Sequence, residues 1–253
     1  MLKVILFDMG DTLLLRNHPN LPIRLRRQND ALHTILCHSY PDIPLPASDE
    51  FHARLSAVMQ QYRNSAATSE IVLEHLCREH GWSIDPADEA LLTAWHAPIL
   101  DDAVVEPDIK ATLAALQTLG LRLGVISNTN WRSPWRDREL AHQGILDYFP
   151  VRIYSADLRV EKPDARIFAA ALAALGDAAP DEALYVGNSL DDDVAGGHAA
   201  GLWTAWLAPA GVTTAPVGAP AAPDLVLTAL RELPAKLAAQ FDLPRHATRA
   251  VGG

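Results

Sequence analysis

Short apolar runs bounded by turn residues recur along the chain and predict buried strands. Continuous apolar runs of this kind are typical of parallel strands that helices cover on both faces. The predicted strands are Val4–Phe7, Leu121–Ile126, Val151–Tyr154, Ala183–Val186, Trp203–Leu207 and a last short one at Leu225–Leu227.

Two amphipathic segments lie between the later runs and predict helices. Asp108–Leu119 and Asp164–Leu175 carry apolar residues at helical spacing, and each is followed by a glycine of the kind that ends helices. Strands that alternate with helices predict an α/β fold. We therefore expect a doubly wound, mainly parallel sheet in a three-layer, Rossmann-like core.

The segment from residue 16 to residue 103 breaks this alternation and predicts only helices. Apolar stripes over residues 51–62 and 72–77 each predict one helix. The segment 85–88 predicts the start of another, with Pro86 at its first position. We expect a core made of residues 1–15 and 104–243, an all-helical domain inserted at 16–103, and a loosely ordered tail at 244–253.

The composition is that of a globular protein and restricts the partners. The chain is 49% hydrophobic and 21% charged, with a net charge of −10. That charge argues against nucleic acid, whose binding depends on clustered Lys and Arg. No apolar run approaches the roughly 20 residues of a membrane span, and two cysteines are too few for a disulfide framework. We expect a cytoplasmic protein, a monomer or homodimer, that binds small molecules rather than membranes.

Four polar groups follow or flank the predicted strands. Asp8 ends the first strand and Ser127 ends the second. Lys162 precedes a predicted helix, and the acidic run Asp191–Asp193 follows the strand at 183–186. Taken singly, each is more typical of a turn, a surface charge or a helix N-terminus. Because ligands bind beyond the carboxyl ends of parallel strands, the set indicates phosphate-transfer chemistry.

These motifs resemble those of the haloacid dehalogenase-like hydrolase superfamily, in its subgroup with a helical cap. The resemblance covers nearly the whole chain and rests on five features: Asp8, Thr12 four residues later, Ser127, Lys162-Pro163 and the run Gly187–Gly196. Most members of the superfamily are magnesium-dependent phosphatases. The inserted helices match the position of their cap, a mobile lid over the substrate pocket. The resemblance therefore implies a hydrolase that acts on a small phosphorylated substrate with Mg²⁺ as cofactor.

The resemblance also implies a role for each motif residue. Asp8 would attack phosphorus and form an aspartyl-phosphate. Ser127 would hydrogen-bond the transferring phosphoryl group, and Lys162 would hold Asp8 and offset the developing charge. The implied magnesium ligands are Asp8, the backbone carbonyl of Gly10, Asn188 and Asp193.

The segment after the second strand supplies candidate substrate contacts. Ser133-Pro134 predicts a helix start, which leaves Trp131 and Arg132 in the loop beside the expected phosphate site. These two side chains can bind an anionic or aromatic substrate. Alternatively, Trp131 packs against the inserted helices or a partner subunit. The candidate substrate-binding residues are Thr12, Ser127, Asn128, Trp131 and Arg132.

Two positions depart from the family's pattern. The phosphatases usually carry a second Asp two residues after the nucleophile, where it protonates the leaving group and then activates water, but Gly10 stands there. Asp11 follows, and it takes over that catalytic role only if the chain turns sharply after the strand. Asn188 stands where an Asp is usual, so the metal site loses one negative charge. These departures favour acyl or aryl phosphates, whose leaving groups need no proton.

The departures leave two alternatives open. A haloacid dehalogenase displaces halide from carbon without metal, which is compatible with Gly10 and Asn188. It needs a halide-binding arginine, and the sequence does not choose among Arg16, Arg24, Arg26 and Arg27. The other alternative binds a phosphorylated ligand or a protein partner without turnover. A phosphonate-cleaving relative is close to excluded, because it needs a cap lysine and no Lys occurs between Lys3 and Lys110.

Overall fold

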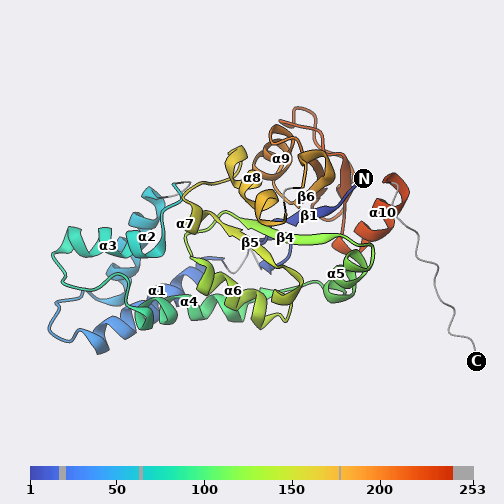
Figure 1. The fold of residues 1–253 in the computed structure, drawn as a ribbon. Helices are drawn as coiled ribbons and strands as arrows, with labels where there is room; N and C mark the ends of the chain where they lie inside the picture. Colours follow the sequence, from blue (N-terminus) through green and yellow to red (C-terminus); the bar gives the residue numbers. More distant parts are fainter. Residues whose placement is uncertain (17–20, 63–64, 177, 242–253) are drawn as a thin grey trace, which may run out of the picture.

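The core of the protein is one six-stranded parallel sheet, as the apolar runs predicted (Figure 1). The computed structural model describes residues 1–16, 21–62, 65–176 and 178–241. The strands lie in the order β5-β4-β1-β6-β7-β8. They are β1 (Val4–Phe7), β4 (Arg122–Ser127), β5 (Val151–Tyr154), β6 (Ala183–Gly187), β7 (Trp203–Leu207) and β8 (Leu225–Leu227).

Two strands run one residue further than predicted. Both added residues lie at the carboxyl end of their strand, where the sequence placed the candidate polar groups. Ser127 pairs with Tyr154 of β5, and Gly187 pairs with Trp206 of β7. Both residues are therefore held by the sheet rather than by the loops that follow.

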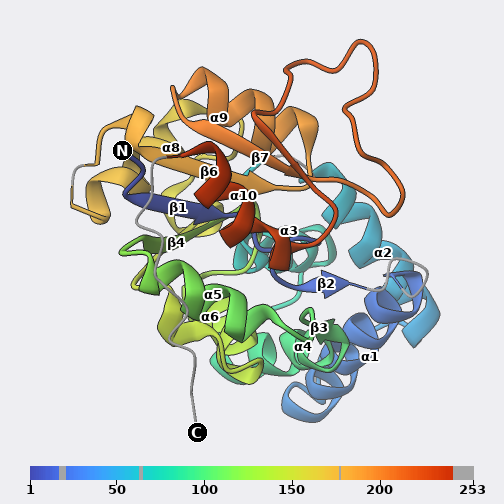
Figure 2. The same cartoon turned by 90° about the vertical axis from the view of Figure 1, so that its right-hand side faces the viewer.

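Helices cover both faces of the sheet, which confirms the three-layer α/β fold (Figures 1 and 2). Ile5 and Phe7 point to the face packed by α5, α6 and α10, while Val4 and Leu6 point to the face packed by α8. The helices of the core are α5 (Ile109–Thr118), α6 (Ser133–His142), α7 (Ser155–Leu158), α8 (Ala165–Ala174), α9 (Gly196–Ala199) and α10 (Leu233–Gln240). Short 3₁₀ segments occur at Leu146–Tyr148, Pro180–Glu182 and Leu230–Glu232, and a π-helical segment at Leu190–Ala195.

Four helices separate β1 from the rest of the core, and we call residues 21–102 the helical insert. They are α1 (Leu21–Ser39), α2 (Ser48–Gln61), α3 (Ser69–His80) and α4 (Glu89–Asp102). Two short antiparallel strands, β2 (Leu15–Arg16) and β3 (Ala103–Val104), pair where the chain leaves and re-enters the core. The insert lies beside the sheet, next to α6 and α7 (Figure 1).

Helix α4 begins three residues later than its sequence pattern indicated. Asp88 is the N-cap, because its side chain accepts the backbone N–H groups of Ala90 and Leu91. Asp85 instead accepts the N–H of Ala87 in a preceding turn. The expectation that Pro86 is the first helical residue was wrong, since the second of two capping Asp residues starts the helix.

The insert has its own apolar core, and two tryptophans of the main core take part in it. Trp131 lies edge-on to Trp95 of α4, with ring centroids 5.2 Å apart, and is also close to Trp135 of α6. This shared cluster fixes α4 against α6. No helix within the described ranges is long and apolar enough to cross a membrane. The tail expected at 244–253 lies outside those ranges.

Candidate active site

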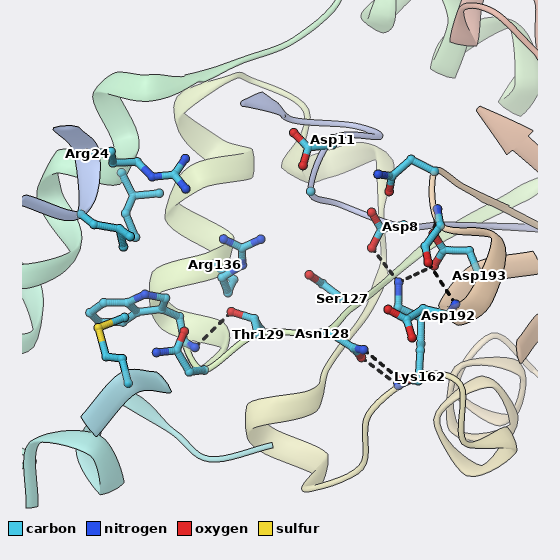
Figure 3. A pocket seen from close by; sticks show the side chains of 18 of the residues that line it. Asp8, Asp11, Arg24, Ser127, Asn128, Thr129, Arg136, Lys162, Asp192 and Asp193 are labelled. Atoms are coloured by element: carbon cyan, nitrogen blue, oxygen red, sulfur yellow. Dashed lines mark hydrogen bonds and ion pairs between the residues drawn. The ribbon is translucent and has the colours of Figure 1, made fainter. Parts of the chain in front are cut away.

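Three strand ends bring polar residues together at one edge of the sheet. Strands β4, β1 and β6 are adjacent and parallel, so their carboxyl ends place Ser127, Asp8 and Asn188 side by side. All three line a cavity of about 370 Å³ that is bounded by both the core and the helical insert (Figure 3). Loops from the same edge add Gly10, Asp11 and Lys162 to its lining.

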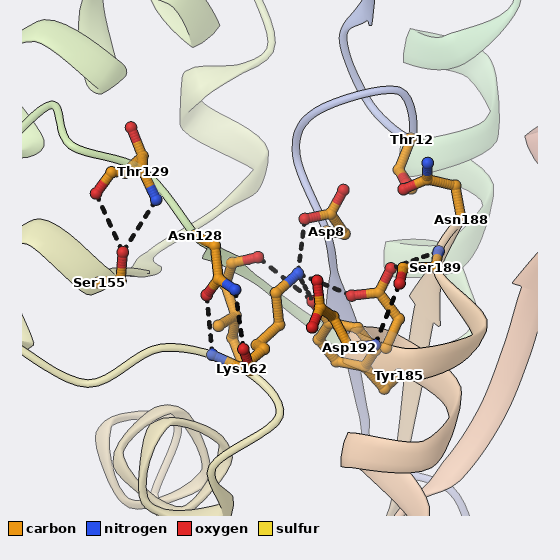
Figure 4. Close-up of polar contacts among 12 residues, drawn as sticks. Asp8, Thr12, Asn128, Thr129, Ser155, Lys162, Tyr185, Asn188, Ser189 and Asp192 are labelled. Carbon is orange, nitrogen blue, oxygen red and sulfur yellow. Dashed lines mark hydrogen bonds and ion pairs between the residues drawn. The ribbon is translucent and has the colours of Figure 1, made fainter. Parts of the chain in front are cut away.

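Lys162 is the centre of a buried polar cluster (Figure 4). Its Nζ donates hydrogen bonds to Asp8 Oδ1 at 2.6 Å, to Asp193 Oδ1 at 2.7 Å and to the Tyr185 hydroxyl at 2.8 Å. Charge-assisted hydrogen bonds to two carboxylates offset the cost of removing the ammonium group from water. The cluster joins residues from the loop after β1, from strand β6 and from the π-helical segment.

Burial and ion pairing shift the pKa of these groups in opposite directions. Burial opposes the charge on Lys162, but Asp193 and Asp8 outweigh it and hold the pKa of Lys162 well above its usual value. Burial raises the pKa of Asp8 to about 6, with Lys162 opposing the rise and Asp193 adding to it. At neutral pH, Asp8 is therefore mostly a carboxylate paired with an ammonium. Its second oxygen points away from Lys162 (Figure 4).

Asp193 lies behind Lys162 and is almost fully buried. One carboxylate oxygen accepts from Lys162, and the other accepts the backbone N–H of Ser189 at 2.9 Å. A side chain at position 187 would lie 2.3 Å from the Asp193 carboxyl group, so glycine there permits this approach. Asp193 is thus engaged through both oxygens, although it also reaches the cavity lining.

Asn128 is held by the main chain of Lys162. Its Nδ2 donates to the Lys162 carbonyl at 2.9 Å, and its Oδ1 accepts the Lys162 N–H at 2.8 Å. Both ends of the amide are occupied, although the side chain borders the cavity. The arrangement makes Asn128 a positioning residue for Lys162, whereas the sequence suggested a direct substrate contact.

We expect Asn128→Ala to lower kcat by roughly tenfold and to change KM little, because two hydrogen bonds that place Lys162 are lost. Steady-state kinetics measure both parameters. A raised KM with an unchanged kcat would instead show that Asn128 contacts the substrate directly.

Thr12 is fully buried and does not line the cavity among the described residues. Its hydroxyl donates to Asn188 Oδ1 at 3.4 Å, while Trp206 Nε1 donates to the Asn188 carbonyl at 2.9 Å. Thr12 therefore orients Asn188, which corrects the expectation that it touches substrate.

The chain turns sharply after β1, at the position where the sequence left Asp11 undecided. Asp11 has a φ of 57°, in the left-handed region that Asp tolerates better than most residues. Its N–H donates to the Leu14 carbonyl at 2.8 Å and closes the turn. Both Gly10 and Asp11 line the cavity, and Figure 3 shows Asp11 on the same rim as Asp8.

The two candidate contacts after β4 separate in the structure. Trp131 packs against Trp95 and His96, as the alternative from the sequence expected, and it also lines the cavity. Arg132 is half-exposed and pairs with Glu70 of α3 at 3.1 Å. Because it points to that helix, Arg132 is outside the described cavity lining, which corrects its expected substrate contact.

The comparison with known proteins assigns the family. Residues 2–201 match the family model for haloacid dehalogenase-like hydrolases. The chain belongs to this family. The resemblance found in the sequence motifs is confirmed, and so is the hydrolase class.

Relatives of this hydrolase include phosphatases and a dehalogenase. It is 28% identical to the glyceraldehyde 3-phosphate phosphatase of Methanopyrus kandleri, over 81% of this chain and 83% of the relative. It is also 28% identical to the ribulose-1,5-bisphosphate 5-phosphatase of Halopiger xanaduensis, over 81% of this chain and 84% of that relative. A solved 2-haloacid dehalogenase from Pseudomonas syringae pv. Tomato DC3000 matches with a TM-score of 0.68 and 26% identity, covering 94% and 99% of the two chains.

Two buried arginines of the hydrolase line the cavity without having been assigned from the sequence: Arg24 of α1 and Arg136 of α6. A signal for Arg24 was present. On α1, the buried positions Leu36, Leu32, Gln28 and Arg24 follow one another at intervals of four. A polar residue that continues a buried apolar stripe indicates a position facing a cavity or a partner.

Proposed function

We propose that this hydrolase is a magnesium-dependent phosphatase for small phosphorylated metabolites, with Asp8 as its nucleophile. The observation that carries the proposal is the carboxylate of Asp8 at the cavity edge, paired with buried Lys162 and next to Ser127. The phosphatase names of two relatives support it.

In the first proposed step, the free oxygen of Asp8 attacks phosphorus and the bond to the ester oxygen breaks, giving an aspartyl-phosphate and the leaving group. Lys162 stays bonded to the other oxygen and offsets the negative charge, and the Ser127 hydroxyl donates to a phosphoryl oxygen. In the second step, water attacks phosphorus, the bond to Asp8 breaks, and inorganic phosphate is released. Asp11 is the candidate acceptor of the water proton.

The oxygen donors at the cavity fit magnesium. Asp8, the amide oxygen of Asn188 and the Gly10 carbonyl are hard ligands, and a small protein set suits an ion that keeps several waters and binds beside phosphate. Within the described ranges, no three His, Cys, Asp or Glu side chains are placed to hold a metal. Bound Mg²⁺ supplies positive charge that offsets repulsion between carboxylate and phosphate. Asp193 adds its negative charge from behind Lys162.

Metal dependence is the direct test. We expect a chelator to abolish phosphate release from acetyl phosphate, p-nitrophenyl phosphate and a sugar phosphate. Asn188→Asp restores a full ligand charge and should lower the Mg²⁺ concentration for half-maximal activity by roughly tenfold. Asn130→Asp is the matched control, because Asn130 lines the same cavity on the loop after β4. An equal shift in both variants would show a general charge effect and no ligand role for Asn188.

We further propose that the helical insert serves as the cap of this enzyme and forms a lid on the core. The support is that α1, α2 and α4 contribute cavity residues opposite the strand ends, and that β2 and β3 form a narrow connection.

A second candidate function is favoured by Arg24. Its guanidinium faces the cavity that holds Asp8, as the halide-binding arginine of a dehalogenase would, and a solved dehalogenase is among the structural neighbours. In that reaction Asp8 displaces chloride from carbon, and water then hydrolyses the ester. Chloride release from a 2-chloro acid in the presence of a chelator would select this function over the phosphatase.

A further inference from the structure

The two buried arginines form one end of the cavity (Figure 3). Arg24 is 8% exposed and belongs to the insert, whereas Arg136 is 2% exposed and belongs to the core. Acidic residues gather at the other end, where Asp8, Asp192 and Asp193 lie near Lys162. The cavity therefore has an acidic end, where the phosphoryl chemistry is proposed, and a basic end that this chemistry does not use.

Arg24 makes no hydrogen bond or ion pair within the part of the chain that the structure describes. Its neighbours on α1 behave differently. Arg26 pairs with Asp30 and Asp49, and Arg27 pairs with two carboxylates at the end of α4. A buried guanidinium without a partner is costly. Its position at a cavity indicates that an anion is its partner when substrate is bound.

Glu139 holds the guanidinium of Arg136 in place and leaves some of its N–H donors without a partner in the described part of the chain. Its Nη1 donates to Glu139 Oε1 at 2.5 Å, and the same carboxylate oxygen is 3.0 Å from His96 Nε2. Burial lowers the pKa of His96, so Arg136 is the cation that pairs with Glu139. Among the residues that the structure describes, the buried Nε of Arg136 has no hydrogen-bond partner. Glu139 therefore fixes this guanidinium without using all of its donors.

We propose that Arg24 and Arg136 form a second anion subsite, which binds a carboxylate or a second phosphate at the far end of the substrate. The inference rests on the proposed phosphatase function, in which the reacting phosphoryl group occupies the Asp8 end. The substrate class is a small phosphate monoester with a second oxyanion, because guanidinium groups match planar carboxylate and phosphate oxygens. A cavity of about 370 Å³ suits a molecule of this size. Such a ligand bridges the insert and the core.

Paired substrates test the subsite by kcat/KM. 3-Phosphoglycerate carries a carboxylate where glycerol 3-phosphate carries a hydroxymethyl group, and fructose 1,6-bisphosphate carries one phosphate more than fructose 6-phosphate. We expect the wild type to prefer the second anion in one pair by roughly 10- to 100-fold, the range for charged hydrogen bonds. The pair that shows the preference tells whether the subsite binds a carboxylate or a phosphate. Arg24→Gln should remove the preference and Arg24→Lys should restore part of it.

Arg27→Gln is the matched control, because it removes the same charge from the same helix at a position that pairs with α4. It should keep the wild-type preference. A preference that is absent from both pairs in the wild type, or that survives Arg24→Gln, would overturn the subsite.

Binding without turnover separates this inference from the phosphatase proposal. In Asp8→Asn protein, the preferred compound with two anionic groups should raise the melting temperature more than its counterpart with one, and adding Arg24→Gln should remove that difference. Without ligand, Arg24→Gln should leave the melting temperature unchanged or raise it, since an unpaired buried charge is removed. Ligand-specific stabilisation that depends on Arg24, with no phosphate released from any substrate, would support the subsite and reject the phosphatase.

Discussion

Asp8→Asn is expected to abolish phosphate release, by at least about 10⁴-fold, from every substrate that the wild type hydrolyses. The amide of asparagine is not a nucleophile toward phosphorus, so no aspartyl-phosphate forms. The fold should tolerate the change. An asparagine oxygen still accepts from Lys162, and that ammonium keeps its bonds to Asp193 and Tyr185.

Intact-mass spectrometry of rapidly quenched samples gives the sharpest measurement, because it shows whether phosphate becomes attached to the wild-type protein and not to the variant. Asp191→Asn is the matched control, since Asp191 is exposed and lies outside the cavity lining within the described residues. It should retain wild-type turnover. Turnover of Asp8→Asn near the wild-type rate would remove Asp8 from the chemistry.

The strands were predictable because burial on both faces demands continuous apolar residues. Runs such as Val4–Phe7 and Ala183–Val186 satisfy that demand, and turn residues mark where each ends. The convergence of Asp8 and Ser127 followed from the same logic, because parallel strands end at one edge. Local capping chemistry was harder to read, as the two nearby Asp residues before α4 show.

Side-chain direction in loops could not be derived from spacing. Thr12 turned out to face Asn188, and Arg132 to face Glu70, because each points according to the course of its loop. The cavity position of Asp11 depends on one left-handed residue that the sequence permits without requiring. Arg24 shows a different difficulty. The four-residue stripe singles out Arg24 among the arginines of α1, but only the packing of that helix against the core shows that the stripe reaches the cavity that holds Asp8.

Gly10→Asp is expected to accelerate the hydrolysis of alkyl phosphates, such as glycerol 3-phosphate, by roughly 10²- to 10⁴-fold. An added carboxyl group at this position can protonate the leaving oxygen and then take a proton from water. The structure has room for it: apart from the two chain neighbours, no heavy atom of the described residues lies within 4 Å of a Cβ built at Gly10. The backbone also permits the change, because Gly10 is not among the glycines with positive φ.

The size of the gain should depend on the leaving group, which makes the test specific. p-Nitrophenyl phosphate and acetyl phosphate leave without a proton, so their rates should rise far less than those of alkyl phosphates. Gly10→Asn is the matched control, since it has the same shape but no proton to give. The gain should persist in Gly10→Asp/Asp11→Asn. If that double variant lost the gain, Asp11 would be the acid and the new side chain would act only by repositioning it. Equal acceleration of both substrate classes would mean that protonation of the leaving group does not limit this enzyme.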